Sequence, residues 1–216
     1  MKKAAIFDMD GLLFDTERLF QKAWHQKAGE LGFTLPPSFV FDISGTSGSR
    51  QEQIISDYMP GCDVGEVIRY VYEAEQRWAA EDLPVMKGAF ELLEGLTESG
   101  LILSVASSSS IPMIERNLEK AGMTRYFHHI VSGTQVSHGK PFPDIFLLAA
   151  EKSGVSPSDC YVFEDSINGI LAGAAAGCAS IMIPDLIPAD EKAKAAAAGI
   201  YPDLLAAWQA IQKGEV

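Results

Sequence analysis

The feature that most constrains the fold is a regular alternation, after residue 84, between short apolar runs and longer segments with helical periodicity. Strands that alternate with helices of about ten to fifteen residues are typical of a doubly wound parallel sheet. The expected strands cover residues 101–106, a short stretch near 130, 160–163 and 180–183. The expected helices cover residues 88–99, 111–121, 143–153, 166–176 and 204–212. We therefore predict an α/β fold.

A second region, residues 15–83, has a different pattern and contains no strand-like run. Apolar residues recur at helical spacing over residues 17–31, and two polar-rich helical stretches are expected near 48–58 and 64–80. This predicts a helical insert at residues 15–83. The α/β core would then be discontinuous, formed by residues 1–14 and 84–216.

The apolar run at residues 4–7 predicts a buried strand, and it leads directly into Asp8 and Asp10. Ligands of open parallel sheets bind at the carboxyl edge, and two residues spaced by one share a face of a strand. Gly11 would let the chain leave the strand at that point. Two such carboxylates repel each other unless a cation or a proton separates them. The alternative is that both residues are solvated turn residues.

Polar residues also follow the other expected strands. Ser107 precedes the N-terminus of a helix, where a hydroxyl and backbone N–H groups can bind phosphate, although Ser110 could equally be an ordinary N-cap. Lys140 lies between a glycine and a proline, and either neutralises an anion or is a surface lysine before a helix. Glu164 and Asp165 form a second acidic pair at the same predicted edge.

This arrangement of acids suggests a metal. Mg²⁺ prefers oxygen ligands and is usually held by one or two carboxylates together with water and substrate phosphate. Asp8 and Asp165, with the backbone carbonyl of Asp10, would supply such ligands. The alternative is that Asp165 only caps the following helix.

Composition excludes several function classes. The net charge of −12 argues against nucleic acid and anionic membranes as main partners. The three cysteines are an odd number and show no C-x-x-C spacing, so neither a disulfide framework nor a zinc knuckle is indicated. No secretory or membrane-spanning pattern is found, and a cytoplasmic location and a monomer are expected.

Taken together, these residues resemble the haloacid dehalogenase-like hydrolase superfamily. The matching motifs are Asp8 to Thr16, Val105 to Ser107, Lys140 to Asp144 and Phe163 to Ile170, and the resemblance covers essentially the whole chain. It is greatest to the branch that contains β-phosphoglucomutase, sugar-phosphate phosphatases and phosphoglycolate phosphatase. The resemblance implies a Rossmann-like core of about five strands and a helical cap inserted between the first two motifs.

The resemblance also implies roles for individual residues. Asp8 would be the nucleophile that forms an aspartyl-phosphate, and Asp10 the general acid and base. Ser107 and Lys140 would hold the transferring phosphoryl group, and Glu164 would lie near the metal as a ligand or as a supporting partner. The remaining residues expected to contact phosphate or substrate are Gly11, Ser108, Asn168 and, in the cap, Arg50. For Arg50 the alternative is a residue at a helix N-terminus that is exposed to water.

Three functions are compatible with this pattern. The favoured one is a Mg²⁺-dependent phosphatase acting on a small phosphorylated metabolite, for which the small cap suggests a sugar or polyol phosphate. The alternative is a phosphomutase of the β-phosphoglucomutase type, which uses the same intermediate. In such mutases a histidine and a lysine usually occupy the positions of Phe20 and Ser110, so these two residues favour the phosphatase. The third function is a binding module that has kept only the fold. It is the least favoured, because every catalytic position carries a residue of the right type.

Overall fold

The computed structural model describes residues 2–44, 46 and 48–216. The chain divides into two compact units, which we call the α/β unit (residues 1–14 and 85–216) and the helical unit (residues 15–84). The boundary differs by one residue from the expected one, because Pro84 belongs to the helical unit. The Pro84 carbonyl accepts a hydrogen bond from the Asp15 backbone N–H at 2.9 Å, so the first and last residues of this unit are paired.

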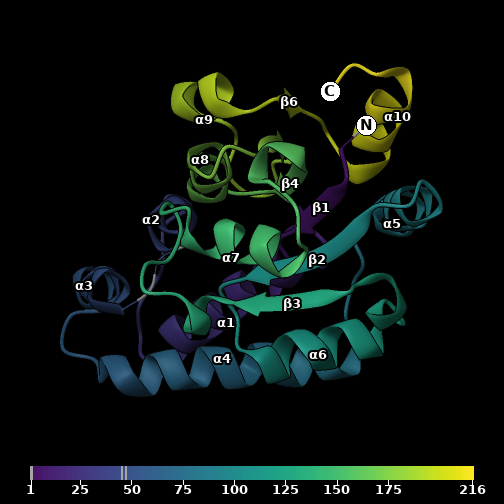
Figure 1. The fold of residues 1–216 in the computed structure, drawn as a ribbon. Coiled ribbons are helices and arrows are strands. Elements are labelled where there is room, and N and C mark those ends of the chain that lie inside the picture. The colour runs from purple at the N-terminus through teal and green to yellow at the C-terminus, as the bar shows by residue number, and fades with distance from the viewer. Residues whose placement is uncertain (1, 45, 47) are drawn as a thin grey trace. The chain divides into compact units, whose positions relative to one another are not determined.

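The α/β unit contains a six-stranded sheet in which all paired strands are parallel (Figure 1). Its order is β3-β2-β1-β4-β5-β6. The strands are β1 (Ala4–Phe7), β2 (Ile102–Ser107), β3 (His129–Ser132), β4 (Cys160–Glu164), β5 (Ala179–Met182) and β6 (Gly199–Ile200). The predicted α/β class is confirmed, but there is one strand more than the five expected. β6 has only two residues, too few to produce a periodic pattern in the sequence.

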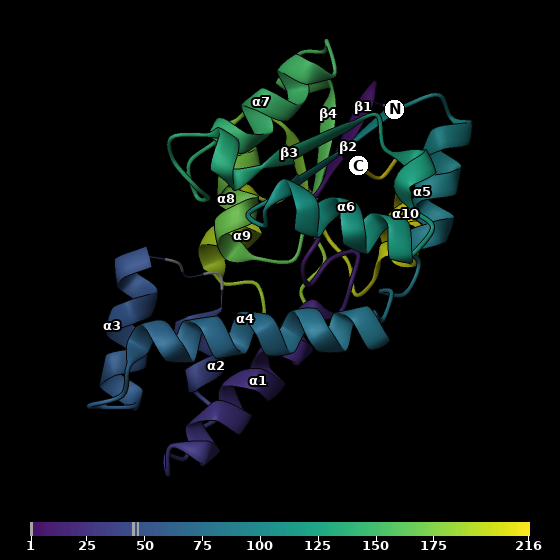
Figure 2. The same ribbon diagram turned by 90° about the horizontal axis from the view of Figure 1, so that it is seen from below.

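Helices cover both faces of this sheet. Figure 2 shows α7 and α8 on one side and α5, α6 and α10 on the other. Their bounds are α5 (Ala89–Glu98), α6 (Ile111–Lys120), α7 (Asp144–Lys152), α8 (Ile167–Ala175) and α10 (Leu204–Lys213). The expected helices agree with these bounds to within a few residues. A short helix that we did not expect, α9 (Glu191–Ala196), packs against α8.

Strand residues alternate between the two faces and explain why the sheet is buried on both. On the side of α7 and α8, Ile6 joins a cluster that includes Phe146 of α7. On the other side, Phe7 stacks on Phe163 of the neighbouring strand, with ring centroids 4.7 Å apart. All four of these side chains are less than 3% exposed, and burying each one contributes about 1.5–3 kcal/mol before the entropy cost of folding.

The topology identifies the edge at which a ligand would bind. From β1 the chain continues to β2 and then β3 on one side, and it later returns to β4, β5 and β6 on the other side. The order therefore reverses between β1 and β4, and such a switch point opens a crevice at the carboxyl ends of the strands. Asp8 lies there, with its backbone N–H donating to the carbonyl of Phe163 at 3.0 Å.

The helical unit has its own apolar core. It comprises α1 (Thr16–Glu30), α2 (Phe39–Ile43), α3 (Gly48–Tyr58) and α4 (Val64–Glu81), of which only the short α2 was not expected. α1 and α4 pack side by side (Figure 2). Trp24 of α1 contacts Phe39 edge to face at a centroid distance of 5.9 Å. The side chain of Asp63 caps α4 by accepting the Glu66 N–H at 2.9 Å.

In neither unit do the described residues include a helix that is long and apolar enough to cross a bilayer.

Candidate active site

The centre of the site is the ammonium group of Lys140, which lies in the loop before α7. Its Nζ donates hydrogen bonds to Asp8 Oδ1 and, at 2.5 Å, to Glu164 Oε1. A third bond, of 3.2 Å, goes to the carbonyl of Ala106 at the end of β2. The three charged side chains are 9% exposed or less. The ends of β1, β2 and β4 are thus joined by one buried cation.

The protonation of this cluster follows from its burial. Burial raises the pKa of the Asp8 carboxyl to about 7, and the negative charges of Glu164 and Asp10 act in the same direction, whereas Lys140 opposes them. Burial by itself would lower the pKa of Lys140. The carboxylates of Asp8 and Glu164 outweigh that effect and raise the pKa above its ordinary value, so Lys140 stays charged.

Asp10, two residues after Asp8, is held by serines of the loop after β2. Ser107 Oγ donates to Asp10 Oδ2 at 3.3 Å, and Ser109 Oγ donates to the same oxygen at 2.8 Å. The structure therefore brings Asp10 and Ser107 together as the sequence suggested. Ser109 was missed, because in a run of four serines nothing in the sequence distinguishes the one whose hydroxyl points to Asp10.

Glu164 is fixed from two sides. Its Oε2 accepts hydrogen bonds from the backbone N–H and the hydroxyl of Ser166, at 3.1 and 2.8 Å. The carboxylate also lies against Gly169 of α8, where an added Cβ would come within 1.8 Å of Glu164 Cδ. Sequence reasoning missed Gly169 as well. A glycine inside an apolar helix is the available signal, since it marks a close approach.

The other predicted residues are placed less centrally. Gly11 has a φ of +79° and its N–H donates to the carbonyl of Phe14, closing a tight turn directly after Asp10. Asp165 is half-buried directly after β4, and Ser108 and Asn168 are exposed. Arg50 belongs to the helical unit and is exposed.

The residues fit a hard cation by their chemistry. No group of three or more His, Cys, Asp or Glu side chains within the described residues is arranged to hold a metal. However, the buried cluster combines two carboxylates with one ammonium, and this excess negative charge is what a bound cation would compensate. Both oxygens of Glu164 accept hydrogen bonds, which favours a supporting role over direct ligation. Lys140 occupies Oδ1 of Asp8 and leaves Oδ2 for a metal or for phosphorus.

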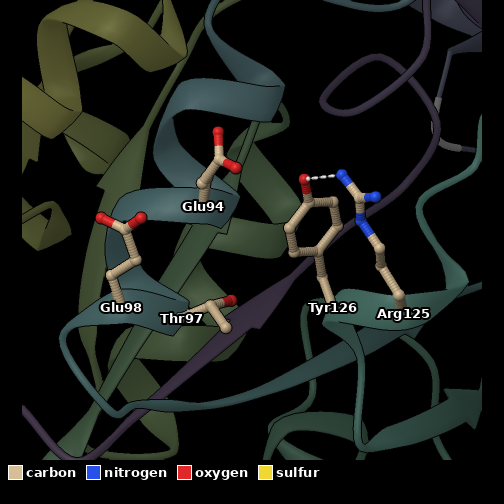
Figure 3. A pocket seen from close by; sticks show the side chains of 5 residues that line it. All are labelled: Glu94, Thr97, Glu98, Arg125 and Tyr126. Carbon is tan, nitrogen blue, oxygen red and sulfur yellow. Dashed lines mark hydrogen bonds between the residues drawn. The ribbon is translucent and has the colours of Figure 1, made fainter.

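Two hollows are lined by residues outside this cluster. The first, of about 340 Å³, is lined by Glu94, Thr97, Glu98, Arg125 and Tyr126 (Figure 3). Arg125 donates to the Tyr126 hydroxyl at 2.8 Å there, so its guanidinium already has a partner. The second, of about 320 Å³, is in the helical unit, where Arg50 lies with Asp42 and Asp57. Neither hollow contains a residue of the Lys140 cluster, and we assign the chemistry to the cluster because it holds the buried charges.

Comparison with known proteins identifies the family of the chain. The model of the haloacid dehalogenase-like hydrolase family matches residues 5–183. A Drosophila melanogaster protein named "Probable pseudouridine-5'-phosphatase" is 36% identical over 197 residues, which cover 87% of this chain and 84% of the relative. Hexitol phosphatase B of Escherichia coli K12 is 32% identical over 186 residues, covering 84% of this chain and 83% of the relative.

Solved structures share the fold. A hydrolase of the same family from Deinococcus radiodurans, crystallised with bound phosphate and sodium, has a TM-score of 0.81 and 26% identity, and the match covers 99% of this chain and 96% of that one. A β-phosphoglucomutase from Clostridium difficile has a TM-score of 0.77 at 22% identity, covering 100% of this chain and 97% of that one. The second likeness concerns the fold alone.

Proposed function

The chain belongs to the haloacid dehalogenase-like hydrolase family, and we propose that it is a Mg²⁺-dependent phosphatase that hydrolyses a small phosphorylated metabolite through an aspartyl-phosphate on Asp8. One observation carries this proposal. A buried carboxylate, Asp8, accepts a hydrogen bond from a charged lysine at the switch point of a parallel sheet, and the charge of a second carboxyl group two residues later, Asp10, acts on it. A nucleophile, a phosphate-binding cation and a proton donor are thus adjacent.

In the first step Asp8 acts on the substrate. A carboxylate oxygen of Asp8 attacks phosphorus, and the bond between phosphorus and the substrate oxygen breaks. Asp10 gives its proton to that oxygen, so the substrate leaves as an alcohol. Lys140 holds the transferring phosphoryl group by its ammonium, and Ser107 by its hydroxyl. The products of this step are the free alcohol and the aspartyl-phosphate.

In the second step the enzyme is restored. Water attacks the phosphorus of the aspartyl-phosphate while Asp10, now a carboxylate, accepts a proton from it. The bond between phosphorus and Asp8 breaks, which releases inorganic phosphate and returns Asp8 to the carboxylate form. Both carboxyl groups are then in their starting states. Asp10 therefore both donates the proton of the first step and accepts the proton of the second.

A metal belongs to this proposal as a cofactor. Asp8, the backbone carbonyl of Asp10 and Asp165 would hold Mg²⁺, and Glu164 would support it by orienting Lys140. When bound, the ion would screen the negative charges of the phosphate and of the carboxylates, so that the two can approach.

The substrate class is a sugar or polyol phosphate. The names of the relatives support it, since one is a hexitol phosphatase and another acts on a phosphorylated nucleoside by its name. We assign the helical unit to the role of a cap that selects the substrate. Arg50, which lines the hollow of that unit together with two aspartates, is a group suited to contact substrate oxygens.

The test is a panel of phosphorylated metabolites assayed for phosphate release with Mg²⁺ and with a chelator. We expect turnover of sugar or polyol phosphates that chelation abolishes and Mg²⁺ restores. Asp8→Asn should remove turnover while leaving the far-ultraviolet circular dichroism spectrum unchanged. Turnover that survives in this variant would place the nucleophile elsewhere, and no release from any substrate would exclude the phosphatase.

The same material separates a phosphatase from a mutase. A coupled assay for glucose 6-phosphate formed from β-glucose 1-phosphate distinguishes transfer to a sugar hydroxyl from transfer to water. The proposal predicts phosphate release without isomer formation, in keeping with Phe20 and Ser110 at positions where mutases of this type usually carry histidine and lysine. Isomer formation at a rate equal to or above that of phosphate release would reverse the assignment.

A further inference from the structure

The loop after β2 places two hydroxyl groups on one oxygen of Asp10. Ser109 Oγ lies 2.8 Å from Asp10 Oδ2, and Ser107 Oγ lies 3.3 Å from it. The torsion that rotates a carboxyl group has broad minima, so the orientation of an aspartate depends on the bonds that its oxygens make. Of the two serines, Ser109 makes the shorter bond to Asp10.

Once a substrate is bound, the two serine hydroxyls cannot both donate a hydrogen bond to Asp10. A serine hydroxyl has a single proton to donate. If Ser107 turns its proton to the phosphoryl group, as the proposed function requires, it can no longer donate to Asp10. Ser109 is then the serine that still holds the Asp10 carboxyl. Ser107 remains linked to Ser109, because Ser107 Oγ accepts the backbone N–H of Ser109 at 3.0 Å.

Ser109 is itself held by the end of the neighbouring strand β3. The hydroxyl of Ser132, which is fully buried, donates to the backbone carbonyl of Ser109 at 2.6 Å. Ser132 Oγ also lies 2.9 Å from Thr134 Oγ1. Since the Ser132 proton goes to the carbonyl, Thr134 is the donor in this second bond. The hydroxyl chain Thr134–Ser132 therefore fixes the backbone of Ser109.

The loop after β2 also packs closely against the segment that follows β3. Gly133, between the two β3-side donors, lies so near the loop that an added Cβ would be 3.2 Å from Ser108 Cα. Few real side-chain contacts are that short, so this position requires glycine or a shift of the loop. The loop that carries Ser109 is therefore packed against the segment that follows β3.

We infer that Ser109 is a positioning residue that orients the Asp10 carboxyl toward the leaving oxygen of the substrate. The inference rests on the proposed function. Because the Ser109 hydroxyl holds one oxygen of the Asp10 carboxyl group, it restricts how that group can rotate. Ser109 contacts Asp10 and acts through it. Its effect is therefore specific to the step in which Asp10 gives its proton to the departing oxygen.

The experiment compares substrates that differ in their need for that proton. A sugar or polyol alcohol must be protonated as it leaves, whereas p-nitrophenolate leaves readily without a proton. kcat/KM reports the steps up to the first phosphoryl transfer and is measured for p-nitrophenyl phosphate and for the best sugar or polyol phosphate of the panel. The variants are Ser109→Ala, Ser109→Thr, which retains the hydroxyl, and Ser110→Ala as the matched control. Ser110 is exposed and its side chain makes no capping bond to α6.

We expect Ser109→Ala to lower kcat/KM for the sugar or polyol phosphate by roughly tenfold or more, since general acid catalysis contributes about 10²- to 10⁴-fold. The value for p-nitrophenyl phosphate should change by no more than about twofold. Ser109→Thr should recover most of the loss, and Ser110→Ala should match the wild type with both substrates. Ser132→Ala keeps the Ser109 hydroxyl but removes the hydrogen bond to the Ser109 backbone. It should also lower kcat/KM for the sugar or polyol phosphate relative to p-nitrophenyl phosphate, by a smaller factor than Ser109→Ala.

Equal losses with both substrates, or no loss with either, would overturn the inference while leaving the phosphatase intact. A wild-type protein that hydrolyses neither substrate would instead overturn the proposed function together with this inference. Thermal unfolding of each variant accompanies the assay. If Ser109→Ala is unfolded, the substrate ratio in Ser132→Ala and Ser109→Thr decides, and an unchanged ratio in Ser132→Ala then counts against the inference.

Discussion

Lys140 is the single cation within a buried group that also contains Asp8 and Glu164. Its attraction to two carboxylates offsets the cost of removing three charges from water, which would otherwise be several kcal/mol for each ion. The group is therefore stable as a unit and vulnerable when one member is removed. The same residue that would bind the phosphoryl group is also a structural residue of the α/β unit.

This predicts a large effect of Lys140→Met, which keeps the length of the side chain and removes the charge. Two buried carboxylates would then face each other without a counterion, and the free energy of unfolding should fall by about 3–5 kcal/mol. Urea unfolding followed by circular dichroism, without added metal, measures the change.

The matched control is the double variant Lys140→Met with Glu164→Gln. Because it removes one of the two uncompensated charges, it should regain a substantial part of the lost stability and no phosphatase activity. If the single variant is as stable as the wild type, the electrostatic account of the cluster is wrong.

At the scale of elements, α5 and α10 pack so closely that a glycine is needed between them. An added Cβ at Gly95 of α5 would lie 2.2 Å from Cζ2 of Trp208 in α10. By contrast, a Cβ at Gly29, in α1 of the helical unit, would meet nothing within 4 Å. Both positions are inside helices, so the higher helix propensity of alanine over glycine applies equally to both.

The two positions should consequently respond to alanine with opposite signs. Gly95→Ala is expected to lower the free energy of unfolding by about 1–3 kcal/mol, because the indole ring must move. Gly29→Ala is expected to raise it by up to about 1 kcal/mol, because alanine restricts the unfolded chain. Chemical denaturation of both variants under one set of conditions checks the pair, and a stabilising Gly95→Ala would contradict the packing.

The first turn of α10 is held by a charged cap. The carboxylate of Asp203 accepts the N–H of Ala206 at 2.8 Å and a hydrogen bond from Lys87 at 2.6 Å. These two interactions, with that of Lys87 the larger, hold the pKa of Asp203 below its usual range. Because the folded-state pKa is the lower one, the stabilisation is present above the ordinary pKa of about 3.9 and is lost as the pH falls through the depressed value.

Asp203→Ala should therefore cost about 1 kcal/mol near neutral pH, and this cost should shrink as the pH is lowered below about 4. Asp203→Asn serves as the control, since an amide oxygen can still cap the helix and does not titrate. Stability of the three proteins is measured by urea unfolding across that range. A cost that stays constant with pH would show that the charge of Asp203 is not what stabilises the cap.

At the scale of the whole molecule, each unit contains an apolar cluster of its own. The described cluster around Trp24 and Phe39 consists of residues of the helical unit, and the cluster around Ile6 and Phe146 consists of residues of the α/β unit. The chain leaves and re-enters the α/β unit at adjacent points. There Phe14 pairs with Val85, and the Met86 N–H donates to the Leu13 carbonyl at 2.9 Å.

We predict that replacing residues 16–83 with a Gly/Ser linker of about two to four residues leaves an α/β unit that still folds, since a hairpin connection of that length can join the paired ends. If the helical unit is a cap that selects substrates, this variant should keep hydrolysis of p-nitrophenyl phosphate and lose most discrimination among sugar phosphates. Cooperative unfolding and kcat/KM over the panel are the measurements. Discrimination equal to that of the full chain would remove the helical unit from substrate selection.

How much could be predicted from the sequence depends on how local the determining interaction is. The alternation of apolar runs and amphipathic segments depends on neighbouring residues, and it was sufficient for the α/β class and for most of the helices. The sixth strand was not predictable, because its two residues are a strand only by pairing with β5. The short helices α2 and α9 have too few turns for a period to be seen.

For the site, the sequence by itself determined which chemical groups follow each strand, because strand ends and their polar residues are contiguous in the chain. Asp8, Asp10, Ser107, Lys140 and Glu164 were all identified in this way, and the structure brings them together. Their catalytic roles, and the metal at Asp165, stay predictions. Only the tertiary structure decided that the hydroxyl of Ser109 reaches Asp10 and that Gly169 makes room for Glu164. The physical reason is that both depend on the spacing between elements distant in the chain, which the packing of helices on the sheet sets and no local pattern records.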